Sequence, residues 1–405
     1  MWWHKVLGSP RHCCAPMVLQ SELAFRMLVR KHGCSLCYAP MLPVAAFLSL
    51  PPDGPTAIAP VTGGPATQAA YLTTCETDRP LLAQLGGADP AQMLAAALLI
   101  QDKVDGVDIN FGCPQACAAT AGYGAFLLDQ PERARAIVEA LVGGLRVPVT
   151  AKMRIFPELA DTLAFARMLE EAGVAALAVH GRRREQRHHE GAADLEAVAA
   201  VKAALRIPVI SNGNVRSKAE ADAALAKTGC DCVMSATALL CNPRLFADEA
   251  EESAEPPALA HAQAPAQAPA QAQPSGAGRA ADGVESGEAD GRGGEADVGE
   301  ADSGGGEVAG AVAGVQAAKR ASMALEYLEC CKTFPDGALP RMISDHLMEM
   351  LKPDLLHSFN ADERKEIKAH RTTTRPAQFA GLVRRVQAHG AFHEQMLQQN
   401  GTKGP

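Results

Sequence analysis

Short apolar runs alternate with helical patterns along the first 249 residues of the chain. Eight of these runs have the length and the Val, Ile and Leu content of buried strands. Between them, apolar residues recur three or four positions apart, as they do on one face of a helix. Strands that alternate with helices form parallel sheets. The predicted strands cover residues 13–18, 35–40, 80–85, 106–110, 147–153, 175–180, 207–211 and 231–236.

Eight strands that alternate with helices favour a (β/α)8 TIM barrel. A doubly wound open sheet is the structural alternative, but no Gly-x-Gly-x-x-Gly motif follows the first strand. The helix signals agree with the barrel. Pro131 suits the first turn of a helix, residues 217–220 form a capping box before a helix that ends near Gly229, and residues 161–172 carry a helical apolar repeat.

A change of composition divides the chain into three parts. Residues 250–314 consist mainly of Ala, Gly, Pro, Gln and Glu, with hardly any large apolar side chain. Such a segment buries too little surface to offset the entropy that ordering costs, so it is predicted to be a disordered linker. We therefore predict a barrel domain over residues 1–249 and a small all-helical domain over residues 315–405.

The net charge of −8 conceals an uneven distribution of charged residues. Residues 248–307 hold fourteen Asp or Glu and two Arg, which leaves 36 Lys or Arg against 32 Asp or Glu elsewhere. The rest of the chain is therefore mildly basic, and the acidic average does not exclude a polyanionic partner. Aromatic residues make up only 4 %, so few rings are available to stack on bases.

The twelve cysteines show no regular spacing, which favours reduced, intracellular thiols. Cys34 and Cys37 form a Cys-x-x-Cys pair, but no second pair completes a zinc site, so we expect a structural role. The first residues lack the apolar stretch of a signal peptide. The sequence contains no run of about twenty apolar residues, which a membrane-spanning helix would need. We expect a soluble, monomeric protein of the cytoplasm or nucleus.

Polar or otherwise distinctive residues follow seven of the eight predicted strands. In a (β/α)8 barrel, catalytic residues lie at the carboxyl ends of the strands. Each of these residues alone is more often a solvated charge, part of a turn or a hydrogen-bonded core group. Their presence together at the carboxyl end of the predicted barrel is what indicates a functional site. The residues are Pro16 and Met17; Gln84; Asn110 and Cys113; Lys152 and Arg154; His180 and Arg182; Asn212, Gly213 and Asn214; and Ser235, Ala236 and Thr237.

The last two strand ends suit a phosphate group, because the loops after strands 7 and 8 of such barrels often bind phosphate through backbone N–H groups. A phosphate-bearing cofactor such as FMN would fit there. Lys152 could then balance negative charge on the flavin, and Gln84 could hydrogen-bond the edge of its ring.

Six blocks of the sequence resemble, in the same order, those of the tRNA-dihydrouridine synthase family, and most closely its eukaryotic branch that modifies nucleotides 16 and 17 of the D loop. The resemblance covers residues 2–247. The blocks are WHKVLGSPRHCCAPMVLQSELAFRMLVRKHGCSLCYAPML, DINFGCPQACAATAGYGAFL, VPVTAKMRIFPE, VHGRRREQ, IPVISNGNV and CVMSATALLCNPRLF.

The resemblance implies a reaction in which NADPH or NADH reduces FMN, and flavin N5 then passes hydride to C6 of a uracil ring. Cys113 corresponds to the catalytic thiol that protonates C5, and a buried thiol suits this role because it keeps its proton at pH 7. The expected substrate-binding residues are Asn110, Arg154 and Arg182, of which Asn110 can hold the uracil edge by its amide. The implied FMN-binding residues are Pro16, Met17, Gln84, Lys152, His180, Asn212, Gly213, Asn214, Ser235 and Ala236.

A tRNA substrate calls for positive charge around the barrel mouth, because phosphate contacts dominate affinity for nucleic acid. The segment QACAATAG after Gly-Cys-Pro lacks the basic residues and the His that are usual in this branch. Two groups of basic residues are expected to contact tRNA, although an idle solvated face is the alternative. They are Arg182, Arg183, Arg184, Arg187, His188 and His189 after the sixth strand, and Arg341, Lys352, Arg364, Lys365, Lys368, Arg384 and Arg385 in the helical domain.

Two other functions remain open from the sequence. One is a barrel flavoenzyme that acts on a free pyrimidine, in which the Cys would serve as a base. The other is a tRNA-binding folding factor with a vestigial site.

Overall fold

The computed structural model describes residues 2–52, 67–186, 190–248, 306–334, 340–357, 380–381 and 383–384. Its strands are β1 (His12–Cys14), β2 (Leu36–Tyr38), β3 (Leu42–Pro43), β4 (Leu81–Gly86), β5 (Gly106–Phe111), β6 (Val149–Ile155), β7 (Leu177–Arg183), β8 (Val209–Asn212) and β9 (Cys232–Ser235). All eight predicted strands are present.

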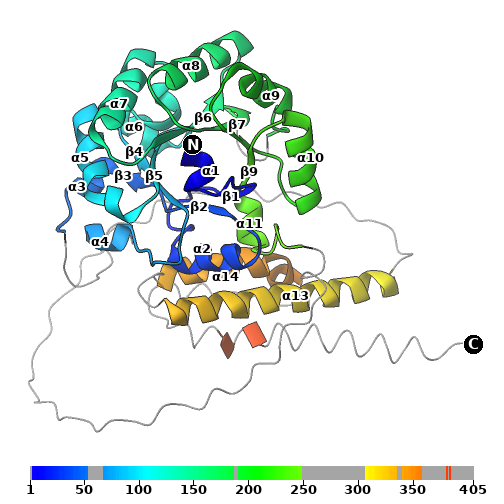
Figure 1. The fold of residues 1–405 in the computed structure, drawn as a ribbon. Coiled ribbons are helices and arrows are strands. Elements are labelled where there is room, and N and C mark those ends of the chain that lie inside the picture. Colours follow the sequence, from blue (N-terminus) through cyan, green and yellow to red (C-terminus); the bar gives the residue numbers. More distant parts are fainter. Residues whose placement is uncertain are drawn as a thin grey trace, which may run out of the picture.

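The strands close into a parallel barrel surrounded by helices (Figure 1). Neighbouring strands pair in chain order, and closure comes from the pairing of β1 with β9 and of β2 with β4. The helices are α1 (Trp2–Lys5), α2 (Leu23–Lys31), α3 (Val44–Leu48), α4 (Gln68–Tyr71), α5 (Pro90–Ile100), α6 (Ala116–Ala121), α7 (Pro131–Gly144), α8 (Leu159–Glu171), α9 (Leu195–Ala204), α10 (Lys218–Thr228), α11 (Thr237–Cys241), α13 (Gly306–Thr333) and α14 (Pro340–His357), with 3-10 turns at Gln101–Lys103 and Gly124–Leu127. The predicted (β/α)8 barrel is confirmed.

The predicted bounds were wrong at the first two strands. β1 ends at Cys14 instead of residue 18, because Pro16 has no N–H group to continue the ladder. The second predicted strand, residues 35–40, shortens to β2, and the unpredicted β3 follows it and pairs with the carboxyl end of β4. Pro40 lies between the two and interrupts the pairing in the same way.

The predicted helix signals are confirmed. Pro131 occupies the first turn of α7. The backbone N–H of Glu220 donates to Ser217 Oγ (3.1 Å) at the start of α10, and Gly229 ends that helix with φ of +64°. The left-handed backbone at Gly229 is one that glycine adopts without a steric penalty.

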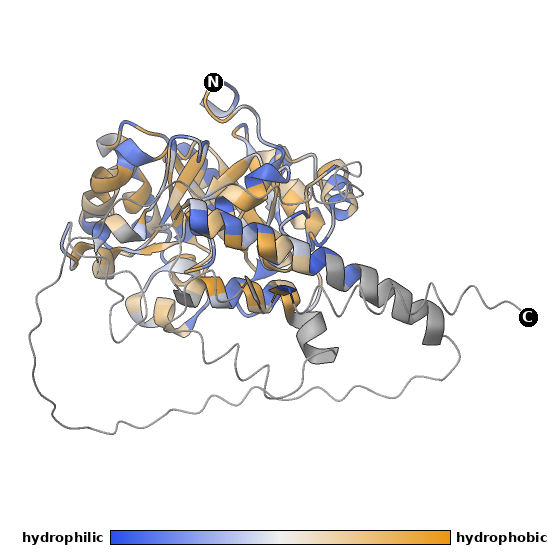
Figure 2. Ribbon diagram, turned by 90° about the horizontal axis from the view of Figure 1, so that it is seen from below, coloured by the Kyte–Doolittle hydropathy of each residue, from blue (hydrophilic) through white to orange (hydrophobic). Residues whose placement is uncertain are grey.

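Side chains that alternate along the strands build two apolar layers, one inside the barrel and one beneath the helices. In Figure 2 the strands are mostly hydrophobic, whereas the helices carry hydrophobic and hydrophilic residues side by side. The short helix α1 closes the amino-terminal end of the barrel, where Trp3 packs into the inner layer and Trp2 Nε1 donates to the carbonyl of Asp105 (3.0 Å). The opposite end, where the strands terminate, is therefore the end available for chemistry.

α13 packs against α2 of the barrel, and α14 packs against α13 and α11 (Figure 1). The contact is polar at its centre, because the buried carboxylate of Glu22 accepts hydrogen bonds from Tyr327 Oη (2.7 Å) and His346 Nε2 (2.8 Å). Burial alone would raise the pKa of Glu22, but these two partners outweigh it and lower that pKa. A buried carboxylate with such partners ties the helical part firmly to the barrel.

Only helices occur among the described residues of the carboxyl-terminal part, as the sequence predicts. α13 begins at Gly306, so its first residues come from the segment that the sequence assigns to the linker. Residues 250–305 and most of residues 358–405 lie outside the described range. None of the helices that the structure describes combines the length and hydrophobicity needed to cross a membrane.

Candidate active site at the carboxyl ends of the strands

Strand register gathers the predicted site residues at one end of the barrel. It sets Asn110 beside Lys152 and Arg154 beside His180. Gln84 pairs with Asp108, one layer further into the barrel. Residues far apart in the sequence therefore meet because parallel strands bring their carboxyl ends to one edge.

Cys113 lies in a tight loop directly after β5. Its N–H donates to Asn110 Oδ1 (2.9 Å), and its carbonyl accepts from the N–H of Ala125 (3.0 Å). Gly124 has φ of +70°, and a Cβ there would lie only 2.6 Å from the Cys113 carbonyl oxygen. The close approach of this glycine holds the backbone of the half-buried Cys113 in one position.

The environment of Cys113 keeps its thiol protonated. Burial raises the pKa of Cys113, while the N–H of Gln115 and the charges of Arg154 and Lys152 act in the opposite direction. The net direction is upward, so the neutral thiol dominates at pH 7. A neutral thiol can donate a proton, which is the chemistry expected of this residue from the sequence.

The segment QACAATAG forms α6, which follows Cys113 directly and ends at the left-handed Gly122. Cys117 on this helix is an exposed thiol, in contrast to the half-buried Cys113. The absence of basic residues from the segment leaves α6 an uncharged face beside the loop.

Asn110 and Gln84 form a buried hydrogen-bond chain with a residue that the sequence reasoning missed. Gln84 Nε2 donates to the carboxylate of Asp108 (2.8 Å), and Asn110 Nδ2 donates to Gln84 Oε1 (3.1 Å). Burial raises the pKa of Asp108 to about 6. Asp108 precedes Asn110 by two positions, so strand alternation could have placed both side chains inside the barrel.

Lys152 lies among charges of both signs. Burial and the neighbouring Arg154 lower the pKa of Lys152 to about 8, although the charge of Asp108 acts in the opposite direction. Within the described ranges, its ammonium group makes no hydrogen bond or ion pair. Such a group fits a bound anion, as a phosphate or a flavin that carries negative charge would supply.

His180 is a neutral imidazole at this end of β7. Burial, together with the charges of Lys152 and Arg154, lowers the pKa of His180 to about 2. Its Nε2 therefore accepts the hydrogen bond from Arg182 (3.2 Å), which leaves Nδ1 as the N–H donor.

The two predicted substrate-binding arginines are directed to backbone carbonyls of the loops. Arg154 donates to the carbonyls of Gly112 (2.9 Å) and Gln186 (2.7 Å). Arg182 donates to the carbonyl of Gly191 (2.8 Å) and to Asn214 Oδ1 (3.0 Å). Both guanidinium groups thus fasten the loops that border the site.

The loops after β8 and β9 turn their polar side chains toward the protein. Asn212 Nδ2 donates to the Met234 carbonyl (3.0 Å), and Ser235 Oγ donates to the Val215 carbonyl (3.0 Å). Gly213 has φ of +119° and leaves no room for a Cβ. Ala236 follows β9 and precedes α11. A phosphate bound between these loops would therefore be held by backbone N–H groups.

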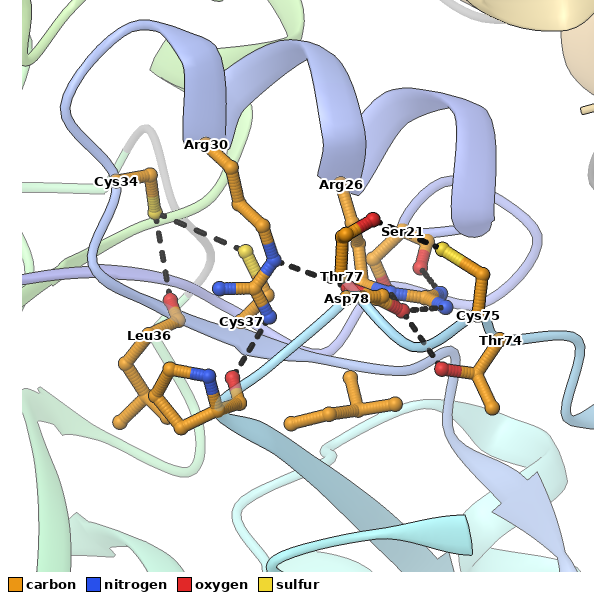
Figure 3. Close-up of polar contacts among 12 residues, drawn as sticks. Ser21, Arg26, Arg30, Cys34, Leu36, Cys37, Thr74, Cys75, Thr77 and Asp78 are labelled. Atoms are coloured by element: carbon orange, nitrogen blue, oxygen red, sulfur yellow. Dashed lines mark hydrogen bonds and ion pairs between the residues drawn. The ribbon is translucent and has the colours of Figure 1, made fainter. Parts of the chain in front are cut away.

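The turn after β1 rests on a buried ionic cluster (Figure 3). Ser21 Oγ accepts from the Met17 N–H (3.0 Å), next to Pro16. The Ser21 carbonyl in turn accepts from Arg26 (2.6 Å), whose guanidinium is paired with the fully buried Asp78. The cluster fixes the Met17 turn, which is predicted to contact FMN.

Cys34 and Cys37 lie beside this cluster with their sulfur atoms 4.0 Å apart (Figure 3). Both thiols are buried beneath α2. The part of the chain that the structure describes contains no group of His, Cys, Asp and Glu arranged to hold a metal ion.

The basic residues expected at the tRNA surface are only partly described. Arg183 is exposed, and Arg184 pairs with Asp129 and lies over the ring of Phe126 at 5.5 Å. Arg384 is exposed in the helical part. The others, including the side chains of Arg341 and Lys352, lie outside the described residues: Arg187, His188, His189, Arg364, Lys365, Lys368 and Arg385.

Comparisons with known proteins agree with this geometry. A family model described as dihydrouridine synthase matches residues 13–273. The chain is 42 % identical over 246 residues to a Rattus norvegicus protein named tRNA-dihydrouridine(16/17) synthase [NAD(P)(+)]-like, an alignment that covers 60 % of this chain and 53 % of that protein. The chain thus spans about half the length of this relative.

Two further relatives differ in the tRNA position that they are named for. The Schizosaccharomyces pombe tRNA-dihydrouridine(16/17) synthase [NAD(P)(+)] is 38 % identical over 247 residues, which is 60 % of this chain and 59 % of that protein. The Mus musculus tRNA-dihydrouridine(20a/20b) synthase [NAD(P)+]-like protein is 39 % identical over 241 residues, which is 59 % of this chain and 69 % of that protein.

Proposed function

The chain belongs to the dihydrouridine synthase family, and from this premise we propose that it reduces uridine to dihydrouridine at positions 16 and 17 of the tRNA D loop, with FMN as cofactor and NADPH or NADH as reductant. The observation that carries the proposal is the protonated, half-buried thiol of Cys113 at the end of β5, close to the unpaired cation of Lys152. The names of two relatives support the choice of positions 16 and 17.

Cys113 supplies a proton to C5 of the uracil ring. When bound, FMN supplies the hydride that reduces C6. The raised pKa of Cys113 keeps the proton on Sγ until the carbon becomes basic enough to accept it. Hydrogen bonds to Asn110 and Ala125 hold the cysteine backbone, so the thiol is presented in a fixed position.

Lys152 and His180 form the side-chain part of the FMN site, whereas the amide of Gln84 is bonded to Asp108 and Asn110. The ammonium group of Lys152 would balance negative charge on a bound FMN. Neutral His180 offers an N–H donor at Nδ1 and adds no charge of its own. The backbone N–H groups after β8 and β9 would hold the phosphate.

Asn110 can orient the uracil without breaking its link to Cys113. One amide hydrogen of Asn110 points to Met41 Sδ (2.9 Å), and a thioether is a weak acceptor. A uracil carbonyl oxygen would be a better partner for that hydrogen. The base must leave the tRNA stack to reach this position, and unstacking costs less in a loop than in a duplex.

The test is to map dihydrouridine in tRNA from cells that lack the protein, complemented with the wild type, with Cys113→Ala or with the matched control Cys117→Ala. We expect the wild type and Cys117→Ala to restore dihydrouridine at positions 16 and 17. Cys113→Ala should slow the reduction of an unmodified tRNA transcript about 10²–10⁴-fold, the usual contribution of a general acid. Reduction of FMN by NADPH should persist.

The following outcomes would contradict the proposal. Unchanged dihydrouridine at positions 16 and 17 in cells without the protein would exclude these two nucleotides as its substrates. Loss of dihydrouridine at positions 20a and 20b would instead make those nucleotides its substrates. Full rescue by Cys113→Ala would remove the acid role of the thiol. A purified protein that cannot be loaded with FMN would favour a folding factor, and reduction of free uracil or uridine without tRNA would favour the free-pyrimidine enzyme.

A further inference from the structure

A continuous hydrogen-bond chain runs through the barrel interior to the Cys113 loop. Thr150 Oγ1 donates to Asp108 Oδ1 (2.6 Å), and Gln84 Nε2 donates to Asp108 Oδ2 (2.8 Å). Asn110 Nδ2 donates to Gln84 Oε1 (3.1 Å). The last link is Asn110 Oδ1, which accepts from the N–H of Cys113 (2.9 Å) and, at the same distance, from that of Gly112.

Each bond of this chain fixes the orientation of the next group. A carboxylate can only accept hydrogen bonds, so Gln84 must turn its NH₂ group toward Asp108. The Oε1 atom of Gln84 then faces Asn110 and can only accept from it. Asn110 must in turn direct its own oxygen toward the loop, where it accepts from the N–H groups of Gly112 and Cys113.

We infer that Asp108 is a positioning residue, which sets the direction of this chain and thereby the placement of the Cys113 loop. Asp108 is fully buried and lies below the layer of Asn110 and Lys152, so it has no direct access to a substrate at the strand ends. The groups that face it are Thr150, Gln84 and Lys152, with Tyr38 nearby on β2.

Replacing the carboxylate by an amide removes this directional constraint. The NH₂ group of an asparagine at position 108 can donate to Gln84 Oε1, so Gln84 and then Asn110 can adopt the opposite orientation. In that orientation the NH₂ group of Asn110 would face the N–H groups of Gly112 and Cys113, and both would lose their acceptor. The loop would then sample several positions although the barrel stays folded.

The first test is hydrogen exchange of the full-length protein with the variants Asp108→Asn and Thr150→Ser. We expect Asp108→Asn to speed exchange of the Gly112 and Cys113 amides about tenfold, the effect of losing one hydrogen bond of ordinary strength. Thr150→Ser, which removes a methyl group beside Asp108 and keeps the hydroxyl, should leave these amides unchanged. The Ala151 amide on β6, bonded to the Ala176 carbonyl (3.2 Å), reports local loosening and should stay protected in both variants.

Gln84→Met provides a second break in the same chain and keeps the test decisive if Asp108→Asn fails to fold. It removes the middle link with a side chain of similar length, so it should speed exchange at the same two amides. Unchanged protection of Gly112 and Cys113 in the folded variants would overturn the inference. Equal loss of protection at Ala151 would also overturn it, because the effect would then be general loosening of the strands.

The kinetic arm of the test rests on the proposed function. Asp108→Asn should lower kcat for uridine reduction about tenfold and leave KM for tRNA and the rate of FMN reduction by NADPH unchanged. A parallel fall in both half-reactions would contradict the positioning role. If the wild type forms no dihydrouridine, the proposed function fails, whereas the exchange measurement still decides the role of Asp108.

Discussion

Asp78→Asn is expected to destabilise the protein strongly, because Asp78 is the shared anion of two arginines beneath the Met17 turn. Its Oδ2 accepts from Arg26 at 2.6 Å, and its Oδ1 accepts from Arg30 at 3.0 Å (Figure 3). The side chain of Asp78 is 0 % exposed, and those of Arg26 and Arg30 are 1 % and 11 % exposed. Solvent therefore cannot replace the lost charge.

The magnitude follows from leaving buried charges without a partner. Removing one partner of a buried ion pair costs about 3–5 kcal/mol, and here two guanidinium groups lose their anion together. For a domain of this size, 1 kcal/mol corresponds to about 2–4 °C in Tm. Asp78→Asn should therefore lower Tm by about 6–20 °C.

The assay is the free energy of unfolding from denaturant titration, together with Tm. Asp102→Asn is the matched control, because Asp102 and Arg146 form an ion pair whose side chains are 76 % and 72 % exposed. Exposed ion pairs contribute less than about 1 kcal/mol, so Asp102→Asn should hardly change Tm or the free energy of unfolding. A cost of Asp78→Asn no larger than that of Asp102→Asn would refute the reasoning.

Two further predictions concern the helical part and the Cys113 loop. Burial would raise the pKa of Glu326, but hydrogen bonds from His32 and Lys31 outweigh it and lower that pKa to about 2. Glu326 therefore stabilises the fold fully above the ordinary pKa of 4.5 and progressively less as pH falls toward 2. Glu326→Gln should flatten the pH dependence of the unfolding free energy across this window, and an unchanged slope would contradict the pairing. Gly124→Ala should lower Tm and slow uridine reduction more than the control Gly122→Ala does. Both positions have φ of +70°, but only at Gly124 would a Cβ lie 2.6 Å from the Cys113 carbonyl oxygen. Equal effects of the two variants would show that the close contact has no role.

Much of the fold could be predicted from local pattern. The eight barrel strands follow from the spacing of apolar residues, and the starts of α7 and α10 follow from Pro131 and Ser217, because these signals act within a few residues of the chain. The unpredicted β3 shows the limit. Its two residues carry no periodic signal, and only the neighbouring end of β4 makes them a strand.

The site was predictable as a set of strand ends but not as a set of contacts. Cys113 and Lys152 could be singled out because a barrel brings all carboxyl ends together. Arg154 and Arg182 both donate to loop carbonyls whose positions depend on how each loop folds back, so the sequence could not show that both side chains hold the loops in place.

By itself, the sequence determined the eight main barrel strands, the starts of α7 and α10 and the place of the thiol after β5, since side-chain periodicity and the special backbone of proline and glycine are local properties. Only the tertiary structure decided that Asp108 joins Gln84 and Thr150, and that Glu22, next to α2, meets His346 on α14. The physical reason is that hydrogen bonds need angstrom-scale registration between distant segments, and that registration exists only once the barrel has closed and the helices have packed.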